Sequence, residues 1–262
     1  SDLFRWNFDI AASTNKNTLD TYSNDIYKVK YKTFGGIGGA GDLGDAFTTY
    51  EGHKIGEFFG KKFAGFNDEG KWLFFDKDGN KVLNADINVS RNDLTQSDYQ
   101  VLGNAVPKYY LSFTNNFQYK AFDLRVFMRG KFDYKVLNTA ALTYGNKTWS
   151  GNLLKDTFTK YAGINDTYMY SDYYLENGSH WKIDEVTLGY NFRFANKAIR
   201  NLRVYFTGQN LVTITKYRGS DPDFISDTGL GNTDSNGRAL GIDNRGAYPS
   251  TRSFLLGLNF NF

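Results

Sequence analysis

The side chains that could serve as nucleophiles, acids, bases or metal ligands are few and scattered along the sequence. His53 and His180 are the only two histidines, and they lie too far apart to match the usual spacing of metal ligands. Cysteine is absent, which excludes thiol catalysis, zinc–thiolate sites and disulfides. Asp184 and Glu185 are adjacent in an expected strand, so their carboxylates should point to opposite faces and cannot act as a pair. We therefore expect no catalytic residue, no metal ion and no cofactor.

Two polar segments resemble binding loops, but each lacks an essential part. The segment FFDKDGNKV (74–82) alternates Asp76, Asp78 and Asn80 like a calcium loop, yet its glycine comes too early and no bidentate glutamate follows. We expect a polar hairpin turn there, with a calcium loop as the lesser alternative. The segment GGIGGAGDLG (35–44) is rich in glycine but lacks the Lys-Ser/Thr ending of a phosphate-binding loop, so we expect a flexible loop.

Two later segments combine aromatic rings with hydrogen-bonding side chains. Aromatic planes stack on the apolar faces of sugars, while carboxylate, amide and guanidinium groups bond to hydroxyls. The mixture suits a carbohydrate or a peptide, and it equally suits a membrane girdle or a docking rim. The candidates for contact with cargo or with a covering protein are Tyr168, Tyr170, Tyr173, Tyr174 and Trp181 in 167–181, and Tyr217, Arg218, Asp221, Asp223 and Phe224 in 216–224.

The composition favours strands with one apolar face and one polar, water-exposed face. Aromatic residues make up 18% of the 262 residues although the mean hydropathy is −0.52, and glycine (27) far outnumbers proline (3). The formal net charge of +3 comes from 31 basic and 28 acidic residues without a long block of either sign, so nucleic-acid binding is not indicated. No apolar stretch approaches the length of a membrane helix.

Alternation with a period of two recurs along the chain and predicts half-buried strands. The first example is FRWNFDI, where Phe4, Trp6, Phe8 and Ile10 alternate with polar residues. A hairpin with a tight turn near residues 120 and 121 should join strands 109–119 and 122–129, and further strands should cover 185–194, 202–209 and 253–262. We expect the polar-face arginines Arg125, Arg129, Arg193 and Arg203 to bridge acidic residues of the barrel or of a plug.

Short and long connections alternate along the same chain. The turns at 119–122 and 195–201 are tight, whereas the loops 136–178 and 217–249 are long, and this asymmetry is typical of outer-membrane barrels. One helix is expected at 152–163, within a long loop. The fold class is therefore predicted as all-β, an antiparallel transmembrane β-barrel forming a single domain over 1–262. A soluble β-sandwich, in which the same rings fill a dry core, is the alternative.

Five blocks resemble SusC-like TonB-dependent transporters of the SusC/RagA family and occur in the family's order. They are EGHKIGEFFGKKFAGF (51–66), VLGNAVPKYYLSFTNNFQYKAFDLRVFMRG (101–130), YLENGSHWKIDEVTLGYNF (174–192), LRVYFTGQNLVTITKYRGSDPD (202–223) and YPSTRSFLLGLNFNF (248–262). The resemblance implies the C-terminal part of a barrel of about 22 strands. Seven or eight strands are expected here, without the plug, the TonB box and the earlier strands, so the edges at 4–10 and 254–262 should pair with the remainder of the barrel.

The resemblance also implies a function in the outer membrane of a Gram-negative, Bacteroidetes-type cell. It suggests active nutrient import, with oligosaccharide as the favoured cargo and peptide as the alternative. The implied partners are a SusD-like surface lipoprotein, TonB through the missing N-terminal region, and membrane lipid. Phe262, Phe260 and Leu258 should form the assembly signal at the end of the last strand. The rival functions are a soluble glycan-binding or glycan-hydrolysing module and a passive porin-like channel.

Overall fold

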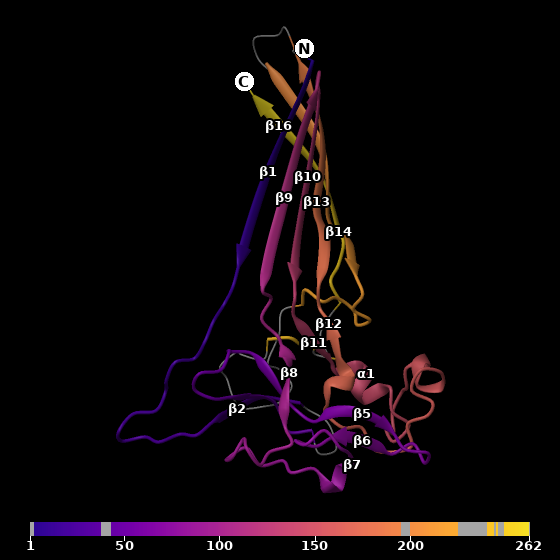
Figure 1. The fold of residues 1–262 in the computed structure, drawn as a ribbon. Helices are drawn as coiled ribbons and strands as arrows, with labels where there is room; N and C mark the ends of the chain where they lie inside the picture. Colours follow the sequence, from indigo (N-terminus) through magenta and orange to yellow (C-terminus); the bar gives the residue numbers. More distant parts are fainter. Residues whose placement is uncertain are drawn as a thin grey trace.

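A tall sheet standing on a compact base makes up the molecule (Figure 1). The computed structural model describes residues 3–37, 43–194, 200–224, 240–243, 245 and 249–261. The first and last described residues both lie toward the narrow end of the tall sheet, on its two opposite edge strands, and the base occupies the other end. The short turn between residues 119 and 122 lies at the narrow end, and the long connections build the base. The predicted short turn at 119–122 and long connection at 136–178 are thus confirmed, whereas most of the predicted turn at 195–201 and of the predicted loop at 217–249 lies outside the described residues.

Six antiparallel strands form the tall sheet, in the order β1-β9-β10-β13-β14-β16. Their lengths of 9 to 15 residues suffice to cross the hydrocarbon layer of a membrane. The strands are β1 (Phe4–Thr14), β9 (Tyr109–Tyr119), β10 (Phe122–Phe132), β13 (His180–Arg193), β14 (Asn201–Thr215) and β16 (Ser253–Asn261). This arrangement confirms the predicted all-β, antiparallel class and leaves β1 and β16 as the edges.

The described part of the chain contributes six long strands, whereas seven or eight were expected. The difference arises because residues 32–104 form short strands in the base, each of three to five residues, which are too short to cross a bilayer. The tight turn predicted near residues 120 and 121 is confirmed between β9 and β10. Lys120 adopts a φ of 55° there, the left-handed conformation that such a turn needs.

The register of the tall sheet places apolar side chains in continuous rows across all six strands. One row consists of Phe4, Tyr119, Phe122, Tyr190, Val204 and Leu258, and the next consists of Trp6, Phe117, Leu124, Leu188, Phe206 and Leu256. The rows between them carry mostly charged, amide and hydroxyl side chains. Because side chains alternate between the faces of a strand, the sheet has one apolar face and one polar face. The alternation predicted from the sequence for 4–10 is confirmed, and the strands predicted at 109–119 and 122–129 alternate in the same way.

Three small sheets build the base. Strands β2 (Lys32–Gly36), β3 (Asp45–Thr49), β4 (Glu57–Gly60) and β8 (Gln100–Asn104) form one of them. Strands β5 (Lys62–Phe66), β6 (Trp72–Phe75) and β7 (Lys81–Leu83) form the second, and β12 (Leu175–Asn177), β11 (Lys135–Asn138) and β15 (Ile242–Asp243) form the third. The turn between β6 and β7 is the predicted polar hairpin, where Asp76 accepts hydrogen bonds from the backbone of Asp78 and Asn80.

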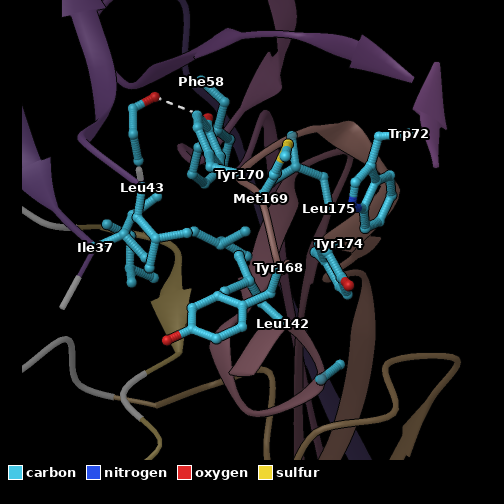
Figure 2. Packing of buried hydrophobic residues seen from close by; sticks show 14 of the residues in the cluster. Ile37, Leu43, Phe58, Trp72, Leu142, Tyr168, Met169, Tyr170, Tyr174 and Leu175 are labelled. Carbon is cyan, nitrogen blue, oxygen red and sulfur yellow. Dashed lines mark hydrogen bonds between the residues drawn. The ribbon is translucent and has the colours of Figure 1, made fainter. Parts of the chain in front are cut away.

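A hydrophobic core holds the base together (Figure 2). Phe47, Phe58, Trp72 and Phe74 are at most 1% exposed, and Leu142 is fully buried beside them. Burying each such ring contributes about 1.5–3 kcal/mol relative to exposure. The base therefore has the dry interior of an ordinary soluble domain, although it is built almost entirely from connections between membrane-length strands.

The helices are short and lie in the base. They are α1 (Thr139–Tyr144) and the 3₁₀ turns η1 (Asn84–Asp86), η2 (Lys155–Phe158) and η3 (Asp172–Tyr174). The helix predicted at 152–163 is wrong: only η2 forms there. Tyr161 packs into the core while Phe158 is 66% exposed, so the segment buries a single ring and not the continuous apolar face that would sustain a longer helix. Among the residues that the structure describes, none of the helices combines the length and the apolarity needed to cross a membrane.

Candidate functional site

The apolar face of the tall sheet is exposed along its length. Leu256 is 75% exposed, Ile10 63% and Phe254 62%. Rings contact across the strands, as Phe206 and Phe254 do with centroids 5.8 Å apart. A continuous apolar patch of this extent marks a surface that meets lipid or another apolar partner. The six strands therefore have the character of a lipid-facing wall, and no second sheet covers this face among the described residues, as a sandwich would require.

The polar face carries ion pairs that cross from strand to strand. Asp123 on β10 and Arg203 on β14 meet over the intervening strand β13, with Arg203 Nη2 2.6 Å from Asp123 Oδ2. The crossing is possible because Gly189 lies between them; a Cβ there would approach the Asp123 carboxylate to 2.6 Å. Asn191 adds a hydrogen bond of 2.9 Å to the same carboxylate. The expected bridging of Arg203 to a barrel carboxylate is confirmed.

A β-bulge places two adjacent carboxylates on this polar face. Phe127 pairs with Glu185 and Met128 with Ile183, so Asp184 is an extra residue in β13 relative to β10. Arg125 forms an ion pair with Glu185, and Arg129 forms one with Asp184. The expectation that Asp184 and Glu185 point to opposite faces is therefore wrong, because the bulge interrupts the alternation. Both carboxylates are nevertheless engaged by arginines, as expected for Arg125 and Arg129.

A cluster of charges fastens the segment after β14 onto the polar face; we call it the loop anchor, and it comprises Arg129, Lys131, His180, Lys182, Asp221 and Asp223. Asp223 Oδ2 lies 2.5 Å from Arg129 Nη2, and Asp223 Oδ1 lies 2.6 Å from Lys131 Nζ. Lys182 Nζ lies 2.9 Å from Asp221 Oδ2. The side chains of Lys182 and Asp221 are only 4% and 6% exposed, so each buried charge has its partner.

The anchor extends to a tyrosine and a histidine beneath it. The Tyr134 hydroxyl donates a hydrogen bond of 3.0 Å to the carbonyl of Pro222, between the two aspartates, and lies 3.1 Å from His180 Nδ1. His180 Nε2 is buried without a hydrogen-bond partner, 4.0 Å from Asp223 Oδ1. Three segments distant in sequence, namely β10 with the adjoining Tyr134, β13, and residues 221–223, are thereby fixed to one another.

Burial and pairing act in opposite directions on the anchor's carboxylates. Burial alone would raise the pKa of Asp223, but the hydrogen bonds from Arg129 and Lys131 outweigh it and lower this pKa to about 2. Burial is also the largest influence on Asp221, and again the hydrogen bonds, including that of Lys182, prevail and leave its pKa below the usual value. Burial raises the pKa of the Tyr134 hydroxyl, so it stays protonated and able to donate. Both aspartates are therefore anionic at neutral pH.

The structure disperses the residues suggested as contacts for cargo. Tyr168, Tyr170 and Tyr174 are 3%, 5% and 1% exposed and belong to the core of the base (Figure 2), and Tyr173 packs against the same core. Trp181 lies on the apolar face of the sheet, where its ring contacts Phe132 at 5.1 Å, rather than with the tyrosines.

The second group of suggested residues surrounds the loop anchor. Asp221 and Asp223 are its two carboxylates. Tyr217 is buried with its hydroxyl bonded to Asp243, and Phe224 packs against the same small cluster. Arg218 is exposed and forms an ion pair of 2.6 Å with Glu176. These side chains thus hold the root of the long loop in place, and contact with cargo stays a prediction for the exposed members.

The proposed assembly residues fall partly within the described chain. Leu258 and Phe260 lie on the apolar face of β16, paired with Val204 and Leu202 of β14. Phe262 lies outside the described residues. Lys131 and Lys182 were not identified from the sequence as functional residues. Their position in the alternation could have indicated them, because each is a cation on the polar face near the loop end of its strand, where it can pair with an acidic loop.

Comparison with known proteins shows which proteins resemble this chain and its tall sheet. No protein-family model matches the chain. The TonB-dependent receptor P3 of Formosa agariphila is 28% identical over 233 residues, covering 81% of this chain and 22% of that protein. The TonB-dependent receptor SusC of Bacteroides thetaiotaomicron is 27% identical over 228 residues, covering 82% of this chain and 20% of that protein. The chain is similar to SusC-like TonB-dependent transporters.

The fold agrees with this assignment. The solved structure of the RagAB peptide transporter matches with a TM-score of 0.72 over 100% of this chain and 28% of that one, at 18% sequence identity. The SusC-like chain thus spans between a fifth and about three tenths of the length of the proteins it matches (20–28%). It is an outer-membrane chain whose long strands are part of a β-barrel. The relatives are named as receptors and transporters, not as enzymes.

Proposed function

We propose that the protein containing this chain imports a nutrient across the outer membrane, and that this chain supplies part of the barrel wall and of its outer loops. The observation that carries the proposal is the two-faced sheet: an exposed apolar face suited to lipid, and a polar face whose charges are paired as the lining of a hydrated interior would be. The similarity to TonB-dependent receptors supports energised import rather than passive flow.

The partners are part of the same proposal. The edges β1 and β16 carry unpaired backbone groups, which hydrocarbon cannot satisfy, so further strands and a plug should complete the barrel. TonB would supply energy through a region that precedes this chain, and a SusD-like lipoprotein would cover the outer opening. Oligosaccharide is the favoured cargo. The match to a peptide transporter supports peptide as the alternative.

Uptake by whole cells tests this function. A strain carrying the full-length protein should accumulate its labelled oligosaccharide, and a strain lacking it should not. Collapsing the proton gradient, or deleting the region that contacts TonB, should abolish accumulation while leaving the protein in the outer membrane. A passive channel would continue to admit the sugar under both treatments, and that result would refute energised import. A soluble module would appear in the aqueous fraction without detergent.

The outer loops provide a second test through the loop anchor. Asp223→Asn removes the charge that Arg129 and Lys131 share, so the long loop after β14 should detach from the polar face. If the anchor shapes the path of cargo, uptake should fall although the amount of assembled barrel stays constant. The exposed Lys28→Met variant is the matched control, because Lys28 lies in a different loop and, within the described part of the chain, forms an ion pair only with Asp25, at 3.5 Å.

A further inference from the structure

A groove of about 420 Å³ opens on the base between three loops that are far apart in the sequence. Its lining is Val29 and Lys30 from the first loop, Tyr50, Glu51 and His53 from the second, and Asn92, Asp93 and Leu94 from the third. We propose that this groove binds a neutral oligosaccharide at the outer surface. The inference rests on the proposed import function and names a capture site for its cargo.

The first wall of the groove is fixed by one carboxylate. Glu51 Oε1 accepts hydrogen bonds from the backbone N–H groups of Tyr22 and Ser23, at 2.9 and 2.7 Å, and from the Thr21 hydroxyl at 2.8 Å. These bonds, with that of Ser23 first in effect, lower the pKa of Glu51 to about 2, so the carboxylate is ionised at all physiological pH values. The first loop is therefore tied to the second.

The base of the same loop is closed by a serine. Ser23 Oγ donates a hydrogen bond of 2.9 Å to the carbonyl of Val29 and accepts one of 3.3 Å from the Val29 N–H. Lys30 is the residue after Val29, so the hydrogen bonds between Ser23 and Val29 fix its position at the groove. A loop that is ordered before binding avoids the entropy cost of ordering on contact.

The opposite wall is fixed independently. The Tyr50 hydroxyl donates to the carbonyl of Arg91 at 3.1 Å, and Arg91 Nε donates to the Thr48 hydroxyl at 3.0 Å. Asp93 Oδ1 accepts from the backbone and the hydroxyl of Thr95, at 3.0 and 2.7 Å. Three loops are thus held at defined separations by side-chain hydrogen bonds rather than by a shared sheet, which is the construction of a preformed site.

The polar groups left over in the groove define the ligand. Among the described residues, no hydrogen bond engages Lys30 or the Asn92 amide, although the Lys30 charge attracts the Asp93 carboxylate across the groove. His53 uses Nδ1 for Glu57 at 3.3 Å and leaves Nε2 for a ligand. Ammonium, amide and imidazole together offer donors and acceptors, which is what sugar hydroxyls require. Val29 and Leu94 offer aliphatic surface for the C–H face of a sugar ring.

Charge argues against an anionic ligand. Two carboxylates, those of Glu51 and Asp93, line the groove beside a single ammonium, that of Lys30. An acidic sugar would be repelled by the surplus negative charge, whereas a neutral sugar is not. A cationic peptide would be attracted, so it is the competitor that the experiment must separate from the neutral sugar.

The experiment uses the detergent-solubilised full-length protein on an array of neutral, acidic and amino glycans with short lysine-containing peptides, followed by titration calorimetry of the strongest hit. Leu94 is 39% exposed, so Leu94→Trp should fill the groove without disturbing the core and should abolish binding. Lys30→Met and Asn92→Ala should each weaken binding by about fivefold, as the loss of one hydrogen bond does. The matched control is Lys28→Met, an exposed lysine on the same loop that does not line the groove.

Each outcome decides the proposal. A neutral glycan that binds the parent protein and the Lys28→Met control but not Leu94→Trp supports it. Binding that survives Leu94→Trp, a preferred hit that is acidic or peptidic, or the absence of any neutral hit overturns it. Uptake measured in parallel separates the two claims: groove binding without energised uptake refutes the import function alone, and uptake unchanged by Leu94→Trp refutes the capture site alone.

Discussion

The tall sheet and the base use the same aromatic residues in opposite ways. In the sheet, Trp6, Phe8 and Phe254 are more than half exposed and form the outer surface. In the base, Phe47, Phe58 and Trp72 are at most 1% exposed and form an interior. The polar face of the sheet pairs its charges across strands, whereas the base buries several uncharged polar side chains, such as Thr139 and Asn146, within its packed interior. One chain therefore contains a region whose surface suits lipid, the tall sheet, and a region whose surface suits water, the base.

The difference shows where the stability of each region comes from. The base carries its own hydrophobic core, so its packing stabilises it in aqueous solution. The sheet has no core, and its apolar face gains free energy only when lipid or detergent replaces water. Substitutions in the base should therefore change its stability in water, whereas substitutions on the apolar face of the sheet should change its stability in lipid or detergent. Four measurements test this difference.

The largest effect is expected from Trp72→Ala in the base. Trp72 is fully buried and its indole N–H donates to the carbonyl of Thr167 at 2.8 Å. Removing the ring should destabilise the base by about 3–5 kcal/mol, measured by chemical denaturation with fluorescence detection. The matched control is Trp6→Ala, at a position 53% exposed on the sheet. Equal losses for the two variants in detergent would contradict the division between core and lipid face.

A charge on the lipid face should have the next largest effect. Leu256→Lys places an ammonium at the most exposed position of the apolar rows, which should cost about 2–4 kcal/mol in a bilayer. Asn259→Lys places the same charge on the polar row of the same strand and should cost much less. Folding into lipid vesicles under a urea gradient measures both. A comparable loss for Asn259→Lys would show that the two faces do not differ as described.

The loop anchor should open in acid. The pKa of Asp223 is about 2 in the folded protein and about 4 when unfolded, so folding favours its ionised form. Its contribution, on the order of 2 kcal/mol, is complete above pH 4 and is lost as the pH falls from about 4 to about 2. Hydrogen exchange of residues 217–224 should accelerate over that interval. In Asp223→Asn the exchange should already be fast at neutral pH and should lose most of its pH dependence; an unchanged profile would eliminate Asp223 as the anchoring group.

The smallest effect is expected from Glu51→Gln. The exposed glutamate ties the first groove loop through three hydrogen bonds, and glutamine keeps an acceptor oxygen but loses the charge. Amide exchange at residues 22 and 23 should become faster while the melting temperature of the base stays the same. Asp25→Asn on the same loop is the control, because Asp25 is fully exposed and pairs only with Lys28. Identical exchange in the two variants would mean that Glu51 does not hold the loop.

Much of the sheet could be predicted because the residue pattern within each strand indicates which of its faces is apolar. Phe4, Trp6 and Phe8 alternate with polar residues, and this local pattern is sufficient to assign their faces. The tight turn at Lys120 follows from the same pattern, since two alternating segments leave only two residues between them. The similarity of five blocks to one family then supplied the kind of barrel, which alternation alone leaves open.

The base and the bulge could not be predicted in the same way. Tyr168, Tyr170 and Tyr174 carry no local sign of burial, because the rings that cover them, such as Trp72 and Phe58, come from strands about a hundred residues away. Asp184 looks like an ordinary strand residue until its partner strand is known. Lys182 and Asp221 attract each other only after a long loop folds back onto the sheet. In each case the deciding contact is distant in sequence.

The bulge at Asp184 makes that position of β13 dispensable for the register with β10. Ile183 and Glu185 face consecutive residues of β10, so removing Asp184 would leave every described pair between β10 and β13 intact. Removing Val186 instead would shift the register by one residue, so the strand residues beyond the deletion would exchange the polar face for the apolar face and the reverse. A single-codon deletion could therefore remove one negative charge from the polar face, and an insertion could restore it, while the pairing of the apolar residues of β13 with β10 stayed as it was.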